Sequence, residues 1–559
     1  MRFFAAELET FRPGASAPTI WNAWGEQAIG QPQTAGAVVS QTALLRVSDI
    51  GWVTPNTDPA GAALAYPPIL SSAFAVDRQL DLAIDGQGAG VAWGGLRFLD
   101  PGGTTSGAVG DRNVDSRTIR ILMGKKTYDR TRGLFLNPMR ASMSEVFVGL
   151  ARQWRPDEDG LNVPMRDATH WLERQLQTAT YAGTGGAEGP AELKGRPKPK
   201  LRGGLTGASV RNISPVLIDA TANIWQISDG PAGIDGSLGL YENGKSVFGF
   251  AGETTDLWTG TTPAGQFRQD HSKGLFQLGS PVAGQITCDA HGQVPGAGGY
   301  TLNSAAASLA VFMMQYDLGV PLANIDLPSF AAVTTALGTL NSQAGWYWDG
   351  ASPTTGADAV GMLMGGVGAR IVPGRNGKLR AMLLRAPQAA NIIAGFTADQ
   401  VVSIVRAPLP EGLSPPPFRI RVGHTHNHTV MSADRISATL RNTPRQQFLA
   451  EADRFASWGG TPIVNAYLRP SDPPPMPTPI LTEGSASVVA ANLGALWGIT
   501  TERKLYQIEI PLDVGLARDI GDTVRLTYPI PDLEAGAPAL IVGEQFRSES
   551  DTIMFTVLV

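Results

Sequence analysis

The chain has 559 residues, of which 44 are basic and 49 acidic, so its formal net charge is −5. A chain of this length exceeds one hydrophobic core and predicts about three or four domains. The lack of a basic surplus argues against a nucleic-acid-binding protein. The 66 glycines and 41 prolines favour many short strands joined by turns over long helices.

Three further features limit the class of protein. A single cysteine, Cys288, excludes an intramolecular disulfide and a cysteine-ligated cluster within the chain. The N-terminal MRFFAAELETF lacks the apolar region of a signal peptide. The longest apolar stretch, residues 305–316, is too short to cross a bilayer. We therefore expect a soluble chain, made in the cytoplasm, without a membrane-spanning segment or a standard export signal.

Residues 1–180 are predicted to form an N-terminal β domain. Strand-like runs separated by turn residues lie at 42–49, 88–100, 116–125 and 144–154. The DEDG stretch at 157–160 is predicted to be a turn. Glycine and proline punctuate residues 181–204, which are predicted to be a connector without regular structure, and short strands continue to residue 300.

Residues 301–390 are predicted to form a small α+β unit. From Ser304 onward, apolar residues recur at helical spacing, and Asn303 or Ser304 is the expected N-cap. A second helix is expected near Ser329 and a third over 357–368. Asn376-Gly377 between two apolar runs predicts a hairpin turn.

Residues 391–559 are predicted to return to β structure, with two helices. Thr443 caps the first helix, which is expected to begin at Pro444 and to run through Phe448, Ala452 and Phe455. The second covers 485–497, and the proline-rich 472–479 between them predicts an extended spacer. Three strands follow. The predicted fold class is mainly β and multidomain with a small α+β insertion, divided at 1–180, 181–300, 301–390 and 391–559.

The stretch GLYENGKS, residues 239–246, fits the phosphate-binding loop pattern G-x-x-x-x-G-K-[ST]. That motif needs a strand before it and a helix after it, because the helix N-terminus helps to hold the phosphates. Here Pro231 and two glycines interrupt the approach, and the strand-forming VFGF follows. Asn243-Gly244 instead favours a type I′ hairpin, which is the reading we adopt.

Two histidine-containing stretches are candidate sites. His424, His426 and His428 would share one face of a strand at spacings of about 7 Å, as a possible metal surface. A polar sheet face is the plainer interpretation, because no carboxylate lies close in sequence to orient the rings. Cys288, Asp289 and His291 are too close together to form a catalytic pair. We expect no catalytic residues, no cofactor and no metal, and hence an architectural role.

Several stretches, taken in order, resemble one family. They are YAGTGG at 181–186, GRPKPK at 195–200, ISPVLIDA at 213–220, the YENGKSV hairpin at 241–247, the 408–430 stretch PLPEGLSPPPFRIRVGHTHNHTV, and the C-terminal 516–529 and 539–557. Together they resemble baseplate or tail-tip hub proteins of long-tailed, siphophage-type phages and prophages. The resemblance spans most of 40–559 and is weakest before 130. His424 departs from it, since the family tends to have tyrosine there.

The resemblance implies a fold and a role. Such hubs have tube-like β-barrel or sandwich domains, two in each chain, and form trimers that join a six-fold tail tube to a three-fold tip. The implied partners are a distal tail protein ring, the tape-measure protein and a central fibre or receptor-binding protein. The implied location is the tail tip of the virion, with DNA passing through the lumen without specific binding. Tyr181, Pro215, Asp219, Asp229, Gly244 and Tyr528 are expected to support this fold.

Two alternatives stay open at this point. A tail-associated cell-wall-degrading enzyme would need a carboxylate pair in a cleft or a metal at the histidine stretch. A carbohydrate-binding tip module would need exposed aromatic residues, for which GWYWDG at 345–350 is the best cluster. We expect these aromatic residues to be packed under the α+β unit instead.

Overall fold

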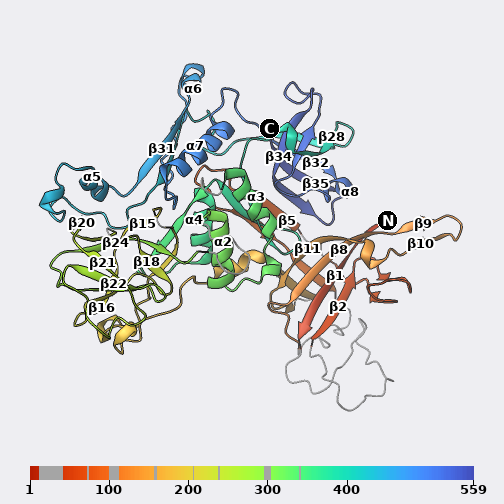
Figure 1. Cartoon of the computed structure of the whole chain (residues 1–559). Helices are drawn as coiled ribbons and strands as arrows, with labels where there is room; N and C mark the ends of the chain where they lie inside the picture. Colours follow the sequence, from red (N-terminus) through yellow and green to blue (C-terminus); the bar gives the residue numbers. More distant parts are fainter. Residues whose placement is uncertain are drawn as a thin grey trace, which may run out of the picture.

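Strands dominate the computed structural model, which describes residues 1–11, 42–71, 75–99, 112–156, 160–205, 207–236, 239–294, 304–338 and 342–559. Figure 1 shows two β lobes next to each other, one around β1 and β8 and one around β32 and β34. A third β lobe, around β15 and β24, lies on the opposite side of helices α2 to α4. The predicted fold class, mainly β and multidomain, is confirmed.

The first large sheet has seven strands in the order β12–β13–β11–β8–β1–β2, with β7 also pairing β13. Its strands are β1 (Arg2–Phe11), β2 (Thr42–Ser48), β7 (Gly95–Leu99), β8 (Thr118–Lys125), β11 (Ser144–Ala151), β12 (Arg155–Pro156) and β13 (Gly160–Arg166). The central β1 is antiparallel to both neighbours, so Glu7 lies opposite Arg46 and Arg120. The strand-like runs predicted at 42–49, 116–125 and 144–154 are confirmed; residues 157–159 of the predicted turn lie outside the described residues.

Two small hairpins accompany this sheet. β3 (Trp52–Val53) pairs β4 (Ala65–Tyr66), and β9 (Thr127–Asp129) pairs β10 (Leu134–Leu136). The first packs its aromatic rings against the sheet, since Trp52 and Tyr66 are buried beside Phe3. The second projects from the body of the molecule (Figure 1).

The second large sheet has eight strands in the order β28–β33–β34–β35–β32–β29, with β5 pairing β34 and β6 pairing β5. Its strands are β5 (Ala75–Leu80), β6 (Ala89–Trp93), β28 (Ile392–Phe396), β29 (Ser403–Ala407), β32 (Leu505–Pro511), β33 (Thr523–Leu526), β34 (Ala537–Arg547) and β35 (Thr552–Leu558). The short helix α8 (Leu512–Gly515) follows β32. The three predicted C-terminal strands are therefore confirmed, and a hairpin from early in the chain completes their sheet.

The two large sheets and the central helices share one hydrophobic core that includes residues from Phe4 to Leu558. The rings of Phe4 and Phe546 lie 6.1 Å apart, and Arg2 pairs with Asp551 at 2.6 Å. The two lobes that hold these sheets are thus packed as one body.

The central unit contains α2 (Ala306–Phe312), a π-helical turn at Met313–Asp317, α3 (Leu327–Leu337), α4 (Gly356–Gly366) and the hairpin of β26 (Ala369–Pro373) with β27 (Leu379–Leu383). The three predicted helices and the Asn376-Gly377 hairpin are confirmed. Ser304 is not the N-cap of α2; Ala305 holds that position, and the Ser304 hydroxyl instead bonds the N–H of Gly204 and the carbonyl of Ala344. Asn303 lies outside the described part of the chain.

The third lobe contains two five-stranded sheets. One has β15 (Val210–Ile213), β18 (Ala232–Ile234), β19 (Leu240–Glu242), β20 (Lys245–Ser246) and β24 (Ile286–Gly292). The other has β16 (Val216–Asp219), β17 (Ile224–Gln226), β21 (Gly249–Glu253), β22 (Gln266–Asp270) and β23 (Leu275–Leu278). Tyr181 is buried under the second sheet and donates to Gln226 at 2.5 Å.

The connector at 181–204 departs from its prediction. It contains β14 (Lys200–Gly203), which pairs with β25 (Gly345–Trp348). The absence of regular structure predicted for its whole length was wrong at this point, because the partner strand lies far away along the sequence and leaves no local signal.

The remaining elements are β30 (Arg419–His424), β31 (Arg454–Gly459), α5 (Pro444–Ala450), α6 (Thr461–Ala466) and α7 (Glu483–Trp497). Thr443 caps α5 as predicted, but the helix ends at Ala450, and Phe455 belongs to β31. The α7 helix confirms the prediction at 485–497. With 15 residues it is the longest helix among the described residues. No helix in this part of the chain is both long and apolar enough to cross a membrane.

Candidate functional site

The GLYENGKS stretch forms a β-hairpin. Asn243 and Gly244 have φ angles of 48° and 77°, as a type I′ turn between β19 and β20 requires. The next element is the strand β21, so the helix that a phosphate-binding loop needs is absent from the described residues at this place. Lys245 is exposed, and Leu449 covers Gly244, because a Cβ on Gly244 would lie 2.1 Å from the Leu449 Cδ1 atom. The hairpin interpretation is confirmed.

The histidine stretch does not form a row on one strand face. β30 ends at His424, and Thr425 has a φ of 50°, which turns the chain out of the strand. Nδ1 of His424 lies 3.0 Å from the Thr425 hydroxyl, and burial lowers the pKa of this imidazole. The predicted one-face arrangement is therefore wrong, because the strand stops before the second histidine.

The second and third histidines lie against each other. The rings of His426 and His428 are 4.6 Å apart and nearly perpendicular, and Tyr347 approaches His428 edge-on at 5.2 Å. Burial, and then the neighbouring His426, lowers the pKa of His428 to about 3. His428 is thus a neutral packing residue near pH 7.

A carboxylate orients His426, although sequence reasoning found none nearby. Asp453 Oδ1 lies 2.7 Å from His426 Nδ1, because the pairing of β30 with β31 places His424 opposite Arg454. Among the described residues no group of three or more His, Cys, Asp or Glu side chains is placed to hold a metal ion. The expectation that the stretch holds no metal stays a prediction.

The surroundings of this stretch join the third lobe to the segment that carries α5. The Asn427 side chain accepts from Asn212 at 2.8 Å and donates to three carbonyl groups of residues 448–451. Nearby, three guanidinium groups surround the Phe448 ring, with Arg454 at 3.8 Å from its centroid. These contacts form a structural connection between the third lobe and the segment that carries α5.

Cys288 and its neighbours separate onto different faces. Cys288 is fully buried on β24, and burial raises the pKa of its thiol well above the ordinary value. The Asp289 carboxylate bonds the Asn212 N–H, the Tyr241 hydroxyl and the Arg211 guanidinium. His291 lies beside His271, with ring centroids 5.7 Å apart. The strand thus separates the thiol from the imidazole, as the sequence argument expected.

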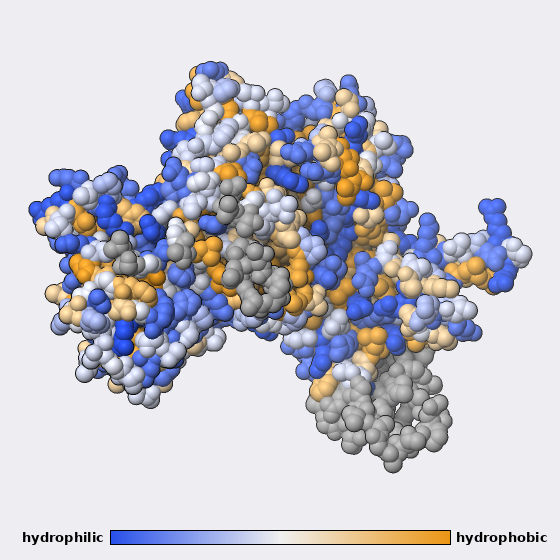
Figure 2. Space-filling model, in the orientation of Figure 1, coloured by the Kyte–Doolittle hydropathy of each residue, from blue (hydrophilic) through white to orange (hydrophobic). Residues whose placement is uncertain are grey.

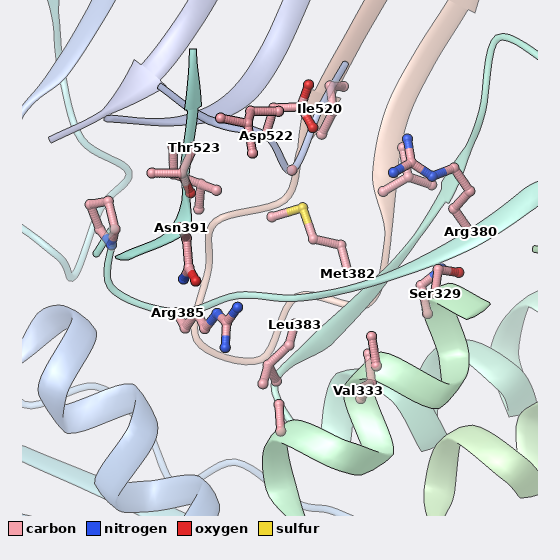
Figure 3. A pocket seen from close by; sticks show the side chains of 18 of the residues that line it. Ser329, Val333, Arg380, Met382, Leu383, Arg385, Asn391, Ile520, Asp522 and Thr523 are labelled. Atoms are coloured by element: carbon pink, nitrogen blue, oxygen red, sulfur yellow. The ribbon is translucent and has the colours of Figure 1, made fainter. Parts of the chain in front are cut away.

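A pocket of about 900 Å³ lies between α3, β27 and the starts of β28 and β33 (Figure 3). Two of its polar side chains are already engaged. Arg380 pairs with Asp519 at 2.7 Å, and Ser329 accepts the N–H of Ala381 at 2.9 Å. Asp522 is the only carboxylate among the pocket residues described, and burial raises its pKa. The pocket residues include no histidine and no second carboxylate to act as an acid–base pair.

A buried charge network connects the central unit to the second large sheet. Arg78 is fully buried; it donates from Nε to Glu544 at 3.1 Å and from Nη2 to Asp519 at 2.6 Å. Arg375 makes a second, bidentate contact with Glu544. Burial opposes the ionisation of Asp519, but nearby Arg78, Arg375 and Arg380 outweigh it and hold the pKa of this carboxyl below its ordinary value. The network fixes the β5–β6 hairpin in place.

The aromatic cluster at 345–350 is packed. Trp346 is buried, the Tyr347 hydroxyl bonds the carbonyl of Ser214 at 3.1 Å, and the Trp348 indole bonds the carbonyl of Ser352 at 2.7 Å. Trp346 and Trp348 pack on the core of the α+β unit as expected, whereas Tyr347 packs against the third lobe. They do not form the exposed aromatic platform that carbohydrate binding would need.

The exposed apolar residues gather in other places, which sequence reasoning did not single out. Tyr128, Leu134 and Phe135 lie on the β9–β10 hairpin, and Val402 and Val405 lie at the β29 edge of the second large sheet. Figure 2 shows hydrophobic and hydrophilic residues side by side on the projecting hairpin. These two surfaces are the best candidates for contacts with other chains.

No family model matches the chain, and no curated protein matches it. Solved structures do match. The chain is similar to a 43 kDa tail protein of prophage MuSo2 from Shewanella oneidensis (9% identity, TM-score 0.28, 87% of this chain and 98% of that one). It is also similar to a tail protein from Neisseria meningitidis MC58 (9%, 0.31, 87% and 90%) and a prophage tail protein from Listeria monocytogenes EGD-e (9%, 0.24, 87% and 94%).

Proposed function

We propose that this chain is a structural protein of a phage or prophage tail, and that it forms the hub of the baseplate or tail tip. The ordered sequence stretches between residues 181 and 557 support this role, since they resemble hub proteins in the same order. The predicted division at 180, 300 and 390 belongs to the same proposal. The hub role would be architectural and without enzymatic turnover.

One structural observation carries the proposal. Each chain presents two large sheets, of seven and eight strands, packed on a common core. If three chains closed into a ring, they would present six such sheets around one bore. That arrangement would match a six-fold tail tube on one side and a three-fold tip on the other.

The partners follow from that position. A distal tail protein ring would lie above the hub, the tape-measure protein in its lumen, and a central fibre or receptor-binding protein below. DNA would pass through the bore without specific binding, because three chains of −5 give a net charge of −15 that repels phosphate groups. An assembled ring with a basic channel wall would contradict this part of the proposal.

The mass and shape of the purified chain test the proposal. Light scattering is expected to give three times the chain mass of 58.9 kDa, and electron microscopy of stained particles is expected to show a three-lobed ring with a central hole. Labelled antibody against the chain should mark the tip of the tail that carries it. A stable monomer, or clearing of peptidoglycan by the chain alone in a zymogram, would overturn the hub role.

A further inference from the structure

The β9–β10 hairpin, here called the arm, is a well-formed element that stands apart from the body (Figure 1). Its strands pair only with each other among the described residues, with Phe135 opposite Tyr128. The Asp129 carboxylate accepts the N–H groups of Thr131 and Arg132, which defines the turn. The arm is thus an ordered hairpin with both outer edges open.

The arm exposes four large apolar side chains to solvent. Tyr128 is 51% exposed, Leu134 46%, Phe135 49% and Leu136 39%. The rings of Tyr128 and Phe135 contact each other at 5.2 Å but leave their outer sides in water. A two-stranded hairpin is at best marginally stable alone, so a partner that covers these side chains would stabilise it.

The charge of the arm favours a second copy of this chain as the partner. The arm, residues 127–136, contains Arg130 and Arg132 against one acid, Asp129, a net charge of +1. Since the whole chain carries −5, the remainder carries −6. The net charge of the arm is therefore opposite in sign to that of the rest of a neighbouring copy, which favours their association.

The β29 edge of the second large sheet matches the arm. β29 pairs only with β32 among the described residues, so its outer backbone groups have no strand partner. Val402 and Val405 are 61% and 59% exposed there. On the neighbouring strand, the Glu509 carboxylate accepts hydrogen bonds from the hydroxyls of Ser403 and Thr552. The charged side chain of β29 itself is Arg406, which lies 3.8 Å from Glu502.

We infer that the arm of one copy docks along the β29 edge of the next copy and extends its sheet. Such strand addition satisfies the open backbone groups of both edges and covers the apolar side chains of both. Arm and edge are different surfaces, so the contact is head-to-tail and can close a ring. The inference rests on the self-association in the proposed function and adds the contact that produces it.

Engineered cysteines test the contact directly. The only native cysteine, Cys288, is fully buried, so introduced thiols report proximity without interference. A chain with both Leu136→Cys and Val405→Cys is expected to give, on oxidation, a covalent ladder that ends at the trimer. The matched control combines Leu136→Cys with Leu468→Cys, since Leu468 is 99% exposed but away from β29. Equal cross-linking in the two chains, or none in the first, would overturn the inference.

A variant of the arm separates this inference from the hub role. Arg130→Glu, Arg132→Glu and Phe135→Ser together should convert the assembly to monomers, while the variant monomers still unfold cooperatively on heating. If the native chain is a monomer, the hub role fails. If native and variant chains are both trimers, only the arm contact fails. If the variant loses binding to a short DNA duplex but keeps its assembly, the arm serves DNA instead, and the inference is wrong.

Discussion

Glu544 binds two guanidinium groups in the buried charge network, so we expect its substitution to destabilise the fold. Its side chain is 1% exposed and contacts Arg78 and Arg375. Removing its charge leaves both cations without their shared partner in a dry environment, where an uncompensated charge costs several kcal/mol. We expect Glu544→Gln to lower the free energy of unfolding by about 3–5 kcal/mol, measured as a shift of the thermal transition.

A matched control neutralises a glutamate that lies outside the buried charge network. Glu411 is exposed in the loop after β29, so Glu411→Gln should change stability by no more than about 0.5 kcal/mol. Equal effects of the two substitutions would show that the network does not hold the β5–β6 hairpin.

The depressed pKa of His428 predicts a pH dependence of stability. Its folded-state pKa of about 3 lies below the ordinary 6.5, so the unfolded chain binds the proton more tightly. Stability is therefore full above pH 6.5 and falls as the pH decreases towards 3, by up to about 1.4 kcal/mol for each pH unit. Thermal unfolding across this range, compared with His428→Leu, measures the contribution, which should be absent in the variant. Parallel pH profiles of the two chains would contradict the assignment.

At the scale of single side chains, local contacts could be predicted from the sequence, and contacts between distant segments could not. The turn at Asn243-Gly244 could be predicted, because adjacent residues contain its whole signal. The setting of His426 could not, because its carboxylate partner, Asp453, is brought close by strand pairing. The same holds for Arg78, whose partner Glu544 is 466 residues away.

At the scale of elements, the β19–β20 turn offers a paired test of the hairpin. Gly244 has a φ of 77° and contacts Leu449, so Gly244→Ala should cost about 1–3 kcal/mol through strain and overlap. Lys245 is exposed, so Lys245→Ala should leave stability within about 0.5 kcal/mol. Thermal unfolding of both variants measures the difference. Nucleotide binding that depends on Lys245 would instead favour a phosphate-binding role.

Elements with a strong internal period were predictable, and those defined by distant partners were not. The α7 helix and the strands β33 to β35 match their predictions. The α5 helix ends early, because the residues after Ala450 pair as β31 with β30 instead of continuing the apolar period. β14 was missed since four residues in a glycine- and proline-rich stretch become a strand only beside β25.

At the scale of the whole molecule, the proposed self-association predicts that stability depends on concentration. A partner that binds only the folded chain raises its thermal midpoint by mass action. We expect the midpoint to rise over a hundred-fold increase in chain concentration, and to rise less in a chain with the arm substitutions. A midpoint that is constant in the native chain would argue against assembly under those conditions.

The pairing of β5 with β34 also has a consequence for how the chain acquires its fold during synthesis. The β5–β6 hairpin emerges early from the ribosome, but the strand that completes its sheet spans Ala537–Arg547. Until Glu544 has been synthesised, the Arg78 guanidinium lacks this carboxylate partner. Contacts between such distant segments form slowly, so this sheet cannot close until the residues between β5 and β34 have been translated. A ribosome stalled before residue 537 would therefore present an unclosed sheet edge, open to capture by chaperones or by other nascent chains.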